Sequence, residues 1–228
     1  MTTIWQDLPS NRLLADVSLW SANLANLEGE IRRVDGYADL YHIDVSDAHF
    51  TRNLLFFPDL VAAVRPLTRK LFHVHLMVEK PLEHIDGFIQ AGADIVSVHL
   101  ENGSDVGQCL SRIRGLNRAA GLAVELDTDL ASFVPFLDSI DMVLLMGTEL
   151  GIKGTSASPN ACPRLTAVKR MLVEKGCGER IKISADGGIR RESVPLLRRA
   201  GADIIVPGSL VFKSSDLAAT FAWVRSLG

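Results

Sequence analysis

The sequence has few of the features that mark secreted, membrane or nucleic-acid-binding proteins. Its three cysteines form no C-x-x-C pair, which favours free thiols in a reducing compartment. No run of about 18 apolar residues is present, and residues 1–9 lack the layout of a signal peptide. The net charge is -3, and no basic stripe in the sequence indicates binding to nucleic acid. We therefore expect a cytoplasmic protein that acts on small molecules, with no nucleic-acid or membrane partner.

The chain also lacks linkers, low-complexity segments and charge blocks, so we expect one domain over residues 1–228. Short apolar runs alternate with amphipathic ones. The predicted strands are 13–18, 40–45, 72–77, 95–99, 122–126, 142–146, 181–185 and 204–206. Between them lie stretches with helical spacing, among them 25–34, 82–91, 107–119, 164–174, 191–199 and 216–226. This pattern of eight βα units predicts an α/β fold, a (β/α)8 TIM barrel, and an open doubly wound sheet is the alternative.

One helix-to-strand joint recurs. Ala91-Gly92-Ala93-Asp94 and Ala200-Gly201-Ala202-Asp203 are near copies, and Gly36-Tyr37-Ala38-Asp39 is a looser one. In each, the glycine suits a left-handed helix C-cap, and the aspartate leads into the next strand. A repeated joint is what a repeated βα architecture requires.

Polar residues lie at the carboxyl ends of the predicted strands, where barrels place their active sites. Ser18 ends the first strand, His42 and Asp44 share one face of the second, His75 lies near the end of the third, and Asp186 follows the seventh. Two imidazoles and two carboxylates at one barrel mouth would suit Zn, Mn, Fe or Co. Taken singly, each residue has an ordinary alternative, such as a hydrogen-bonded core histidine or a turn aspartate.

Glycines mark a phosphate site. They follow the sixth, seventh and eighth strands, and strands seven and eight are where barrels bind phosphate through backbone N–H groups. The residues concerned are Gly151, Lys153, Gly154, Gly187, Gly188, Gly208 and Ser209. The alternative for each loop is a tight turn that needs glycine for a positive φ.

These motifs together resemble the ribulose-phosphate 3-epimerase family over nearly the whole chain. The similarity is carried by His42-Ile43-Asp44-Val45-Ser46-Asp47, His49-Phe50 with Asn53, His75-Leu76-Met77, Ala91 to Asp94 with His99, Leu144-Leu145-Met146, Asp186-Gly187-Gly188, and Ala200 to Asp203 through Gly208-Ser209. The resemblance implies a ribulose-phosphate-binding (β/α)8 barrel, an isomerase of carbohydrate metabolism that inverts C3 of a ketose phosphate with one divalent metal ion. D-ribulose 5-phosphate and D-xylulose 5-phosphate of the pentose phosphate route are the default pair.

The resemblance also implies a role for each matching residue. His42, Asp44, His75 and Asp186 would be the metal ligands, and Asp44 and Asp186 also the catalytic acid and base. The substrate contacts would be Ser18, His75, Met77, Met146, Gly151, Lys153, Gly154, Gly187, Gly188, Gly208 and Ser209. Met77 and Met146 would form an apolar floor, although ordinary core filling is the alternative.

Departures from the family pattern surround this set. The loop Glu149-Leu150-Gly151-Ile152-Lys153-Gly154 replaces Asn-Pro-Gly-Phe-Gly-Gly, Val17 replaces a proline, and His73 stands where an aspartate is expected. A paralogue acting on allulose 6-phosphate or another sugar phosphate is therefore an alternative, as is a non-catalytic sugar-phosphate-binding barrel. No strand end supplies the lysine of a Schiff-base aldolase, and no D-x-K-x-x-D run indicates an orotidine-phosphate decarboxylase.

Subunit association is a further expectation. Barrels of this kind often form homo-oligomers, and Trp5, Trp20, Phe56 and Phe57 could contribute to a contact. Burial in the core explains these aromatic residues equally well.

Overall fold

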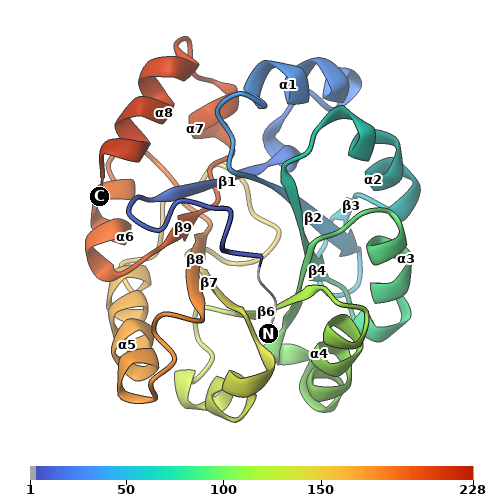
Figure 1. Ribbon diagram of the computed structural model, residues 1–228, viewed down its shortest axis with the longest axis vertical. Coiled ribbons are helices and arrows are strands. Elements are labelled where there is room, and N and C mark those ends of the chain that lie inside the picture. The colour runs from blue at the N-terminus through green and yellow to red at the C-terminus, as the bar shows by residue number, and fades with distance from the viewer. Residues whose placement is uncertain (1–3, 228) are drawn as a thin grey trace.

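Eight parallel strands close into a ring, and helices surround it (Figure 1). The computed structural model describes residues 4–227. The strands are β1 (Leu14–Ser18), β2 (Leu40–Asp47), β4 (Leu71–Met77), β5 (Ile95–His99), β6 (Ala119–Val124), β7 (Met142–Met146), β8 (Lys182–Asp186) and β9 (Ile204–Ile205), and β3 (Leu54–Leu55) pairs antiparallel with β2 outside the ring. Pairing of β1 with β2 closes the ring and confirms the predicted (β/α)8 barrel.

Helices pack their apolar faces on the ring. They are α1 (Leu27–Val34), α2 (Pro58–Val64), α3 (Ile85–Gln90), α4 (Val106–Gly115), α5 (Ala161–Glu174), α6 (Val194–Ala200), α7 (Ser209–Phe212) and α8 (Leu217–Ser226). In α1, Leu27, Ile31 and Val34 recur at helical spacing and are buried, while acidic residues occupy the first turn and arginines the last. Both features favour this helix: the apolar stripe packs against the ring, and the charges complement the helix dipole.

Three local predictions were wrong. The helix predicted over 107–119 ends at Gly115, because Asn117 adopts a left-handed φ of 57°. Strand β6 consequently starts at Ala119, three residues before the predicted strand, and ends at Val124. Gly36 has no positive φ, whereas Gly92 and Gly201 have φ of 107° and 113° as predicted. Helix α2 was missed, because its seven residues are too short for a clear period.

Four aspartates, three of them from the recurring joint, have a structural role at the amino ends of the strands. Each accepts a hydrogen bond from a backbone N–H of the neighbouring strand at 2.9 to 3.0 Å: Asp39 from Ala15, Asp94 from Phe72, Asp141 from Ala120 and Asp203 from Ile183. We call these four contacts the aspartate clamps. They join β1 to β2, β4 to β5, β6 to β7 and β8 to β9. The strands are therefore held together in pairs at the end of the barrel opposite the predicted site.

The barrel interior is apolar at the base and polar above it. Inward-facing Leu14, Leu40, Ile95, Ala119, Met142 and Ile204 form a buried cluster at the base. Ile4, Trp5 and Leu8 pack against this cluster from below. The next inward positions carry buried Asp16, His42, His73, Ser97 and Ser184. Barrel interiors are more often filled by branched apolar residues, so this polar layer needs a functional explanation.

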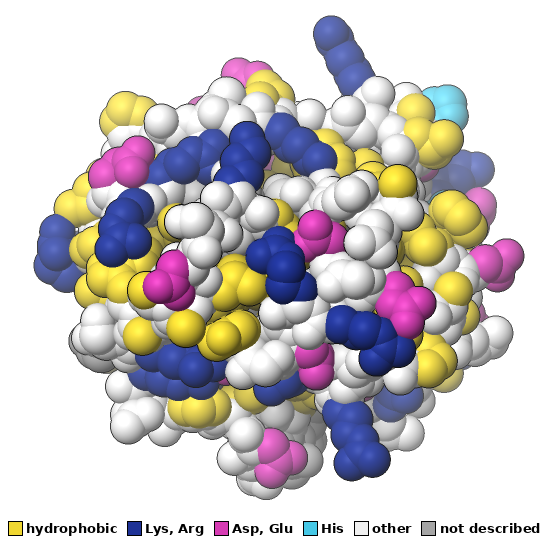
Figure 2. Space-filling model, turned by 90° about the horizontal axis from the view of Figure 1, so that it is seen from above, with side chains coloured by type: hydrophobic (Ala, Val, Ile, Leu, Met, Phe, Trp, Pro, Cys, Tyr) yellow, Lys and Arg dark blue, Asp and Glu magenta, His cyan; other side chains and the backbone are white. Residues whose placement is uncertain are grey.

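The surface mixes charges and apolar side chains. On the face shown in Figure 2, Lys and Arg side chains lie among Asp, Glu and apolar ones. Of the four aromatic residues considered for subunit contacts, Phe57 is 59% exposed, whereas Phe56 is buried and Trp5 packs under the barrel. Homo-oligomer formation stays a prediction. Within residues 4–227, none of the helices combines the length and the apolar character that crossing a bilayer demands.

We expect Asp141→Ala to lower the free energy of unfolding by about 1 to 3 kcal/mol, because the buried N–H of Ala120 loses its acceptor. Urea unfolding measures this loss. Exposed Asp138→Ala, three residues earlier, is the matched control and should stay within about 0.5 kcal/mol of wild type. Equal stability of the two variants would show that the clamp contributes nothing.

Candidate active site

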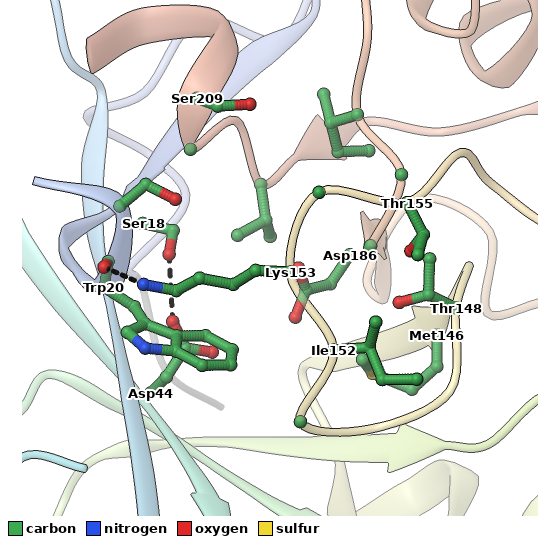
Figure 3. Close-up of a pocket in the computed structure, with 18 of the residues that line it drawn as sticks. Ser18, Trp20, Asp44, Met146, Thr148, Ile152, Lys153, Thr155, Asp186 and Ser209 are labelled. Carbon is green, nitrogen blue, oxygen red and sulfur yellow. Dashed lines mark hydrogen bonds between the residues drawn. The ribbon is translucent and has the colours of Figure 1, made fainter. Parts of the chain in front are cut away.

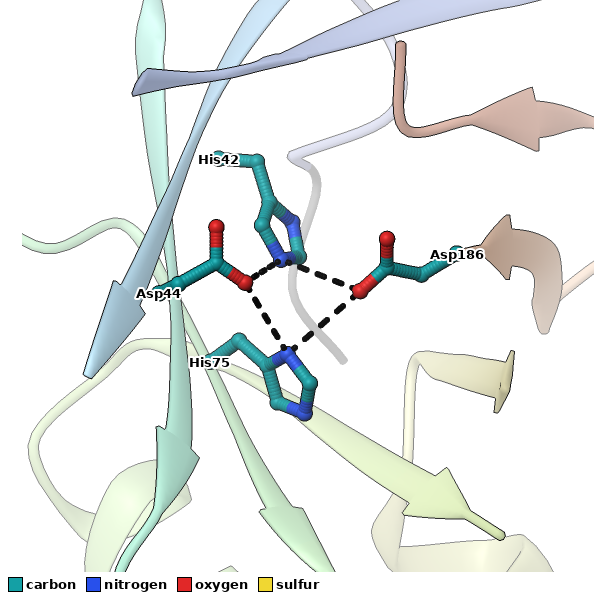
Figure 4. A group of neighbouring side chains, drawn as sticks. All are labelled: His42, Asp44, His75 and Asp186. Carbon is teal, nitrogen blue, oxygen red and sulfur yellow. Dashed lines mark ion pairs between the residues drawn. The ribbon is translucent and has the colours of Figure 1, made fainter. Parts of the chain in front are cut away.

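Four polar side chains from three strands converge inside the carboxyl end of the barrel (Figure 4). Strand β2 supplies His42 and Asp44, β4 supplies His75, and β8 ends at Asp186. The period of two turns His42 and Asp44 inward from the same strand, and the β2–β4 register places Asp44 beside His75. We call these four residues the His–Asp cluster. All four were predicted to meet here.

The spacing of the cluster suits one ion. His42 Nε2 lies 3.3 Å from Asp44 Oδ1 and 3.6 Å from Asp186 Oδ2, and His75 Nδ1 lies 3.7 Å and 3.6 Å from the same oxygens. Four donors at zinc-ligand distances in a tetrahedron would be about 3.4 Å apart. The donor atoms are thus too far apart for good hydrogen bonds and well placed for a shared cation.

Two orphaned nitrogen atoms strengthen this interpretation. His42 Nε2 and His75 Nδ1 are buried, and neither has a hydrogen-bond partner. Both point to the centre of the cluster in Figure 4. Buried polar atoms are nearly always satisfied, so an unpaired pair aimed at two carboxylates fits a divalent metal ion that both would ligate.

Charge and burial drive the cluster pKa values apart. Burial, with the carboxylates of Asp44 and Asp16 nearby, raises the pKa of Asp186 to about 7. Burial lowers the pKa of His75 to about 3. Burial also opposes ionisation of Asp44, but His42 and His75 outweigh it and lower the pKa of that carboxyl. The metal-free cluster therefore holds protons that a metal ion must displace.

A buried layer lies directly beneath the cluster and was only partly predicted. Asp16 Oδ2 is 3.1 Å from His42 Nδ1 and 2.6 Å from His73 Nδ1, and His73 Nε2 is 2.7 Å from Ser97 Oγ. The sequence placed His73 on the face of His75 but did not single out Asp16. An acidic residue two positions before Ser18 on the same strand was the available signal, because it must face inward too.

A second polar chain leads outward from His75. His75 Nε2 is 2.8 Å from His99 Nε2, and His99 Nδ1 is 3.1 Å from Glu101 Oε2. Glu101 Oε1 also accepts hydrogen bonds from the backbone N–H of Glu125, at 3.0 Å, and from the Thr128 hydroxyl. His99 was recognised only as a motif residue, and Glu101 was not recognised at all.

A pocket of about 610 Å³ opens above the cluster, a volume within the range of small-molecule sites. Asp44 and Asp186 line its floor. All but one of the predicted substrate contacts also line the pocket: Ser18, Met77, Met146, Gly151, Lys153, Gly154, Gly187, Gly188, Gly208 and Ser209. Trp20, Thr148, Arg190 and Lys213 line it as well and were not predicted.

Two predicted contacts have additional roles. Ser18 Oγ donates a hydrogen bond to Asp44 Oδ2 at 2.9 Å, so Ser18 holds the carboxylate whose other oxygen faces the cluster. His75 is fully buried, and it belongs to the cluster rather than to the pocket lining. Its contact with substrate stays a prediction.

Lys153 spans the pocket from the loop after β7 (Figure 3). Its Nζ donates to the backbone carbonyl of Trp20 at 2.5 Å and lies 4.3 Å from the centre of the Trp20 ring. The same loop is tied to the β2–β3 segment, since Asn53 Nδ2 donates to Gly151 O at 2.7 Å. The altered loop therefore brings a cation over the pocket.

A (β/α)8 barrel whose carboxyl end combines a buried His–Asp cluster with a glycine-lined pocket has the layout of an enzyme active site. Residues 14–212 match the Ribulose-phosphate 3 epimerase family. Ribulose-phosphate 3-epimerase of Bacillus subtilis is 38% identical over 91% of this chain and 96% of that protein, and its Synechocystis counterpart is 36% identical over 95% of each. The chain belongs to this family and is an isomerase.

Solved structures confirm the fold. The 3-keto-L-gulonate-6-phosphate decarboxylase of Vibrio cholerae superposes with a TM-score of 0.69 over 95% of this chain and 97% of that one. The 3-hexulose-6-phosphate synthase of Salmonella typhimurium gives 0.65 over 94% and 98%. Their identities are 15% and 17%, so the likeness is one of fold alone.

We expect metal binding to release protons and to weaken below about pH 7, because Asp186 must be ionised to act as a ligand. Each displaced proton should cost up to about tenfold in affinity per pH unit. Calorimetric titration with zinc in buffers of different ionisation enthalpy counts the protons. Asp186→Asn should release one fewer, and a release that is zero and independent of pH would contradict the assignment.

Proposed function

We propose that this protein is a metal-dependent 3-epimerase of a ketose phosphate, with D-ribulose 5-phosphate and D-xylulose 5-phosphate as the default pair. One observation carries the proposal: Asp44 and Asp186 face each other from opposite sides of the two imidazoles, at the floor of a pocket (Figure 4). The names of the relatives support the same substrate pair.

The reaction needs two acid–base groups. Inverting a carbon next to a carbonyl requires removing its proton from one face and returning a proton to the other, which one carboxylate cannot do. Asp44 and Asp186 are placed for the two faces, so one takes the C3 proton while the other, protonated, donates. In the metal-free site the two carboxyls are not equivalent, because burial raises the pKa of Asp186 to about 7 whereas the imidazoles of His42 and His75 lower the pKa of Asp44.

His42, Asp44, His75 and Asp186 would hold one divalent ion, and their mixed nitrogen and oxygen donors suit Zn, Mn, Fe or Co. When bound, such an ion would polarise the substrate carbonyl and stabilise negative charge on oxygen. The protein's own contribution is to orient the ligands: Ser18 holds Asp44, and Asp16 holds His42. Elemental analysis of the purified protein identifies the metal.

The remaining pocket residues bind the substrate. Gly187, Gly188, Gly208 and Ser209 line the end after β8 and β9, where backbone N–H groups would take the phosphate. Arg190 donates to Ser209 Oγ at 3.0 Å and adds positive charge at that end. Met77 and Met146 supply apolar surface near the carboxylates.

The loop carrying Lys153 makes allulose 6-phosphate or another sugar phosphate the alternative substrate. Lys153 and its partner Trp20 both line the pocket, so the altered loop helps to define the space available beyond the carboxylates. A panel of pentulose and hexulose phosphates therefore belongs in every assay.

We expect the wild-type protein to exchange the C3 proton of its substrate with D2O, followed by NMR over that panel. Asp44→Asn and Asp186→Asn should each slow exchange by at least about 10² to 10⁴, the usual effect of removing a general acid or base. Asp59→Asn is the matched control, since Asp59 is exposed on α2, does not line the pocket, and should leave exchange in place.

Failure of the metal-loaded wild type to exchange protons on any of these substrates would overturn the epimerase proposal and favour a sugar-phosphate-binding barrel without catalysis. Interconversion of the two epimers that persists in Asp186→Asn, followed in the same NMR spectra, would remove that residue from the acid–base pair.

We expect Lys153→Gln to raise KM for a phosphorylated ketose by about tenfold with a smaller change in kcat, because the lost cation binds ground state and transition state alike. Steady-state kinetics separates the two constants. Lys80→Gln is the control, since its 70% exposed side chain pairs with Glu83 outside the pocket. An unchanged KM in Lys153→Gln would mean that this lysine holds the loop and does not contact substrate.

A further inference from the structure

A continuous line of hydrogen-bonding groups runs from the His–Asp cluster to the rim of the barrel. It passes from His75 Nε2 to His99 Nε2 at 2.8 Å, and from His99 Nδ1 to Glu101 Oε2 at 3.1 Å. Both imidazoles are completely buried, and 22% of the Glu101 side chain is exposed. The line therefore connects His75, a candidate metal ligand, through His99 to the carboxylate of Glu101.

The protons along this line are interdependent. A neutral imidazole carries one N–H, so each ring donates from one nitrogen and accepts on the other. If His99 donates from Nδ1 to the Glu101 carboxylate, His99 Nε2 has a lone pair and accepts the N–H of His75 Nε2. His75 Nδ1 is then unprotonated, and this is the orphaned atom that faces Asp44 and Asp186.

A competing contact tests this logic. The backbone N–H of Asn102 caps onto the His99 side chain, which would favour a lone pair on Nδ1. That tautomer of His99 would reverse the direction of the hydrogen bonds and place a proton on His75 Nδ1, where a metal must bind. The full charge on Glu101 favours an N–H on Nδ1 more strongly than the amide dipole favours a lone pair, because charge-assisted hydrogen bonds are about twice as strong.

We propose that Glu101, acting through His99, is a positioning residue that fixes the tautomer of His75 and so sets the metal affinity of the site. The proposal rests on the metal site of the proposed function. Asp16 has the corresponding role for His42, since it accepts a hydrogen bond from His42 Nδ1 and leaves Nε2 facing the cluster. Each histidine is thus oriented by a carboxylate outside the ligand set.

Glu101→Gln should reverse the direction of the hydrogen bonds from residue 101 through His99 to His75. Glu101 Oε1 accepts from both the Glu125 N–H and the Thr128 hydroxyl, so a glutamine would keep its carbonyl oxygen there. Its NH2 group would then face His99 Nδ1 and require a lone pair on that atom. His99 would donate from Nε2, and His75 would hold its proton on Nδ1. We expect zinc to bind about 10 to 100 times more weakly, as loss of such outer carboxylates typically causes.

Competition between the protein and a chelator for zinc measures this affinity directly. Two controls match the variant. Glu125→Gln removes the same charge from a side chain 4.0 Å from His99 Nδ1, and Thr128→Val disturbs the same loop while leaving the carboxylate in place. Both should stay within about twofold of wild type, the scale of a screened surface charge or one lost exposed contact. Thermal unfolding checks that all three variants fold.

Long-range ¹H–¹⁵N NMR of the zinc-loaded wild type reads the tautomers. We expect protons on His99 Nδ1 and His75 Nε2. A proton on His99 Nε2, or zinc affinity of Glu101→Gln equal to wild type, would overturn the inference and leave the epimerase proposal standing. Absence of zinc binding by the wild type would overturn this inference and the metal site together, while C3 proton exchange would still test the reaction.

Discussion

The structure depends on burying two carboxylates and two imidazoles that face one another inside a closed ring of strands. Removing such groups from water is costly unless each is paired. The surrounding residues satisfy the atoms that point away from the centre: Ser18 serves Asp44, Asp16 serves His42 and His99 serves His75. The imidazole nitrogens that point inward are left unpaired. These two nitrogens face the two carboxylates at one point, where a divalent cation would satisfy them, while Asp16 Oδ1 and Ser184 Oγ are unpaired in the layer beneath.

Much of the fold and cluster could be predicted, because strand ends and a period of two are properties of local sequence. Asp186 ends β8, and the other three residues of the cluster lie within β2 and β4 on the inward face that the period of two identifies. The polar layer beneath them could not be predicted in full, since Asp16 meets His42 and His73 only through the lateral register of three strands. Strand β6 was misplaced because Ala119, Ala120 and Gly121 carry no β-branched side chain.

The departures from the family pattern divide between the interior and the mouth. Inside, His73 replaces an expected aspartate, yet Asp16 places a carboxylate against His42 from the neighbouring strand. At the mouth, Lys153 and Trp20 form a contact across the pocket. At the first position the interior keeps a carboxylate against a proposed metal ligand, whereas at the second a cation and an aromatic ring lie at the pocket.

The aspartate clamps bear on how such a chain can vary. They tie the strands two by two at the closed base, far from the pocket, and three of them are reinforced by arginine at 2.7 to 3.3 Å. Each pair of joined strands is a quarter of the barrel and has its own hydrogen bond at the base. These contacts at the base do not involve the rim loops. A change in the rim loops of one quarter leaves the hydrogen bonds at the base of all four quarters in place.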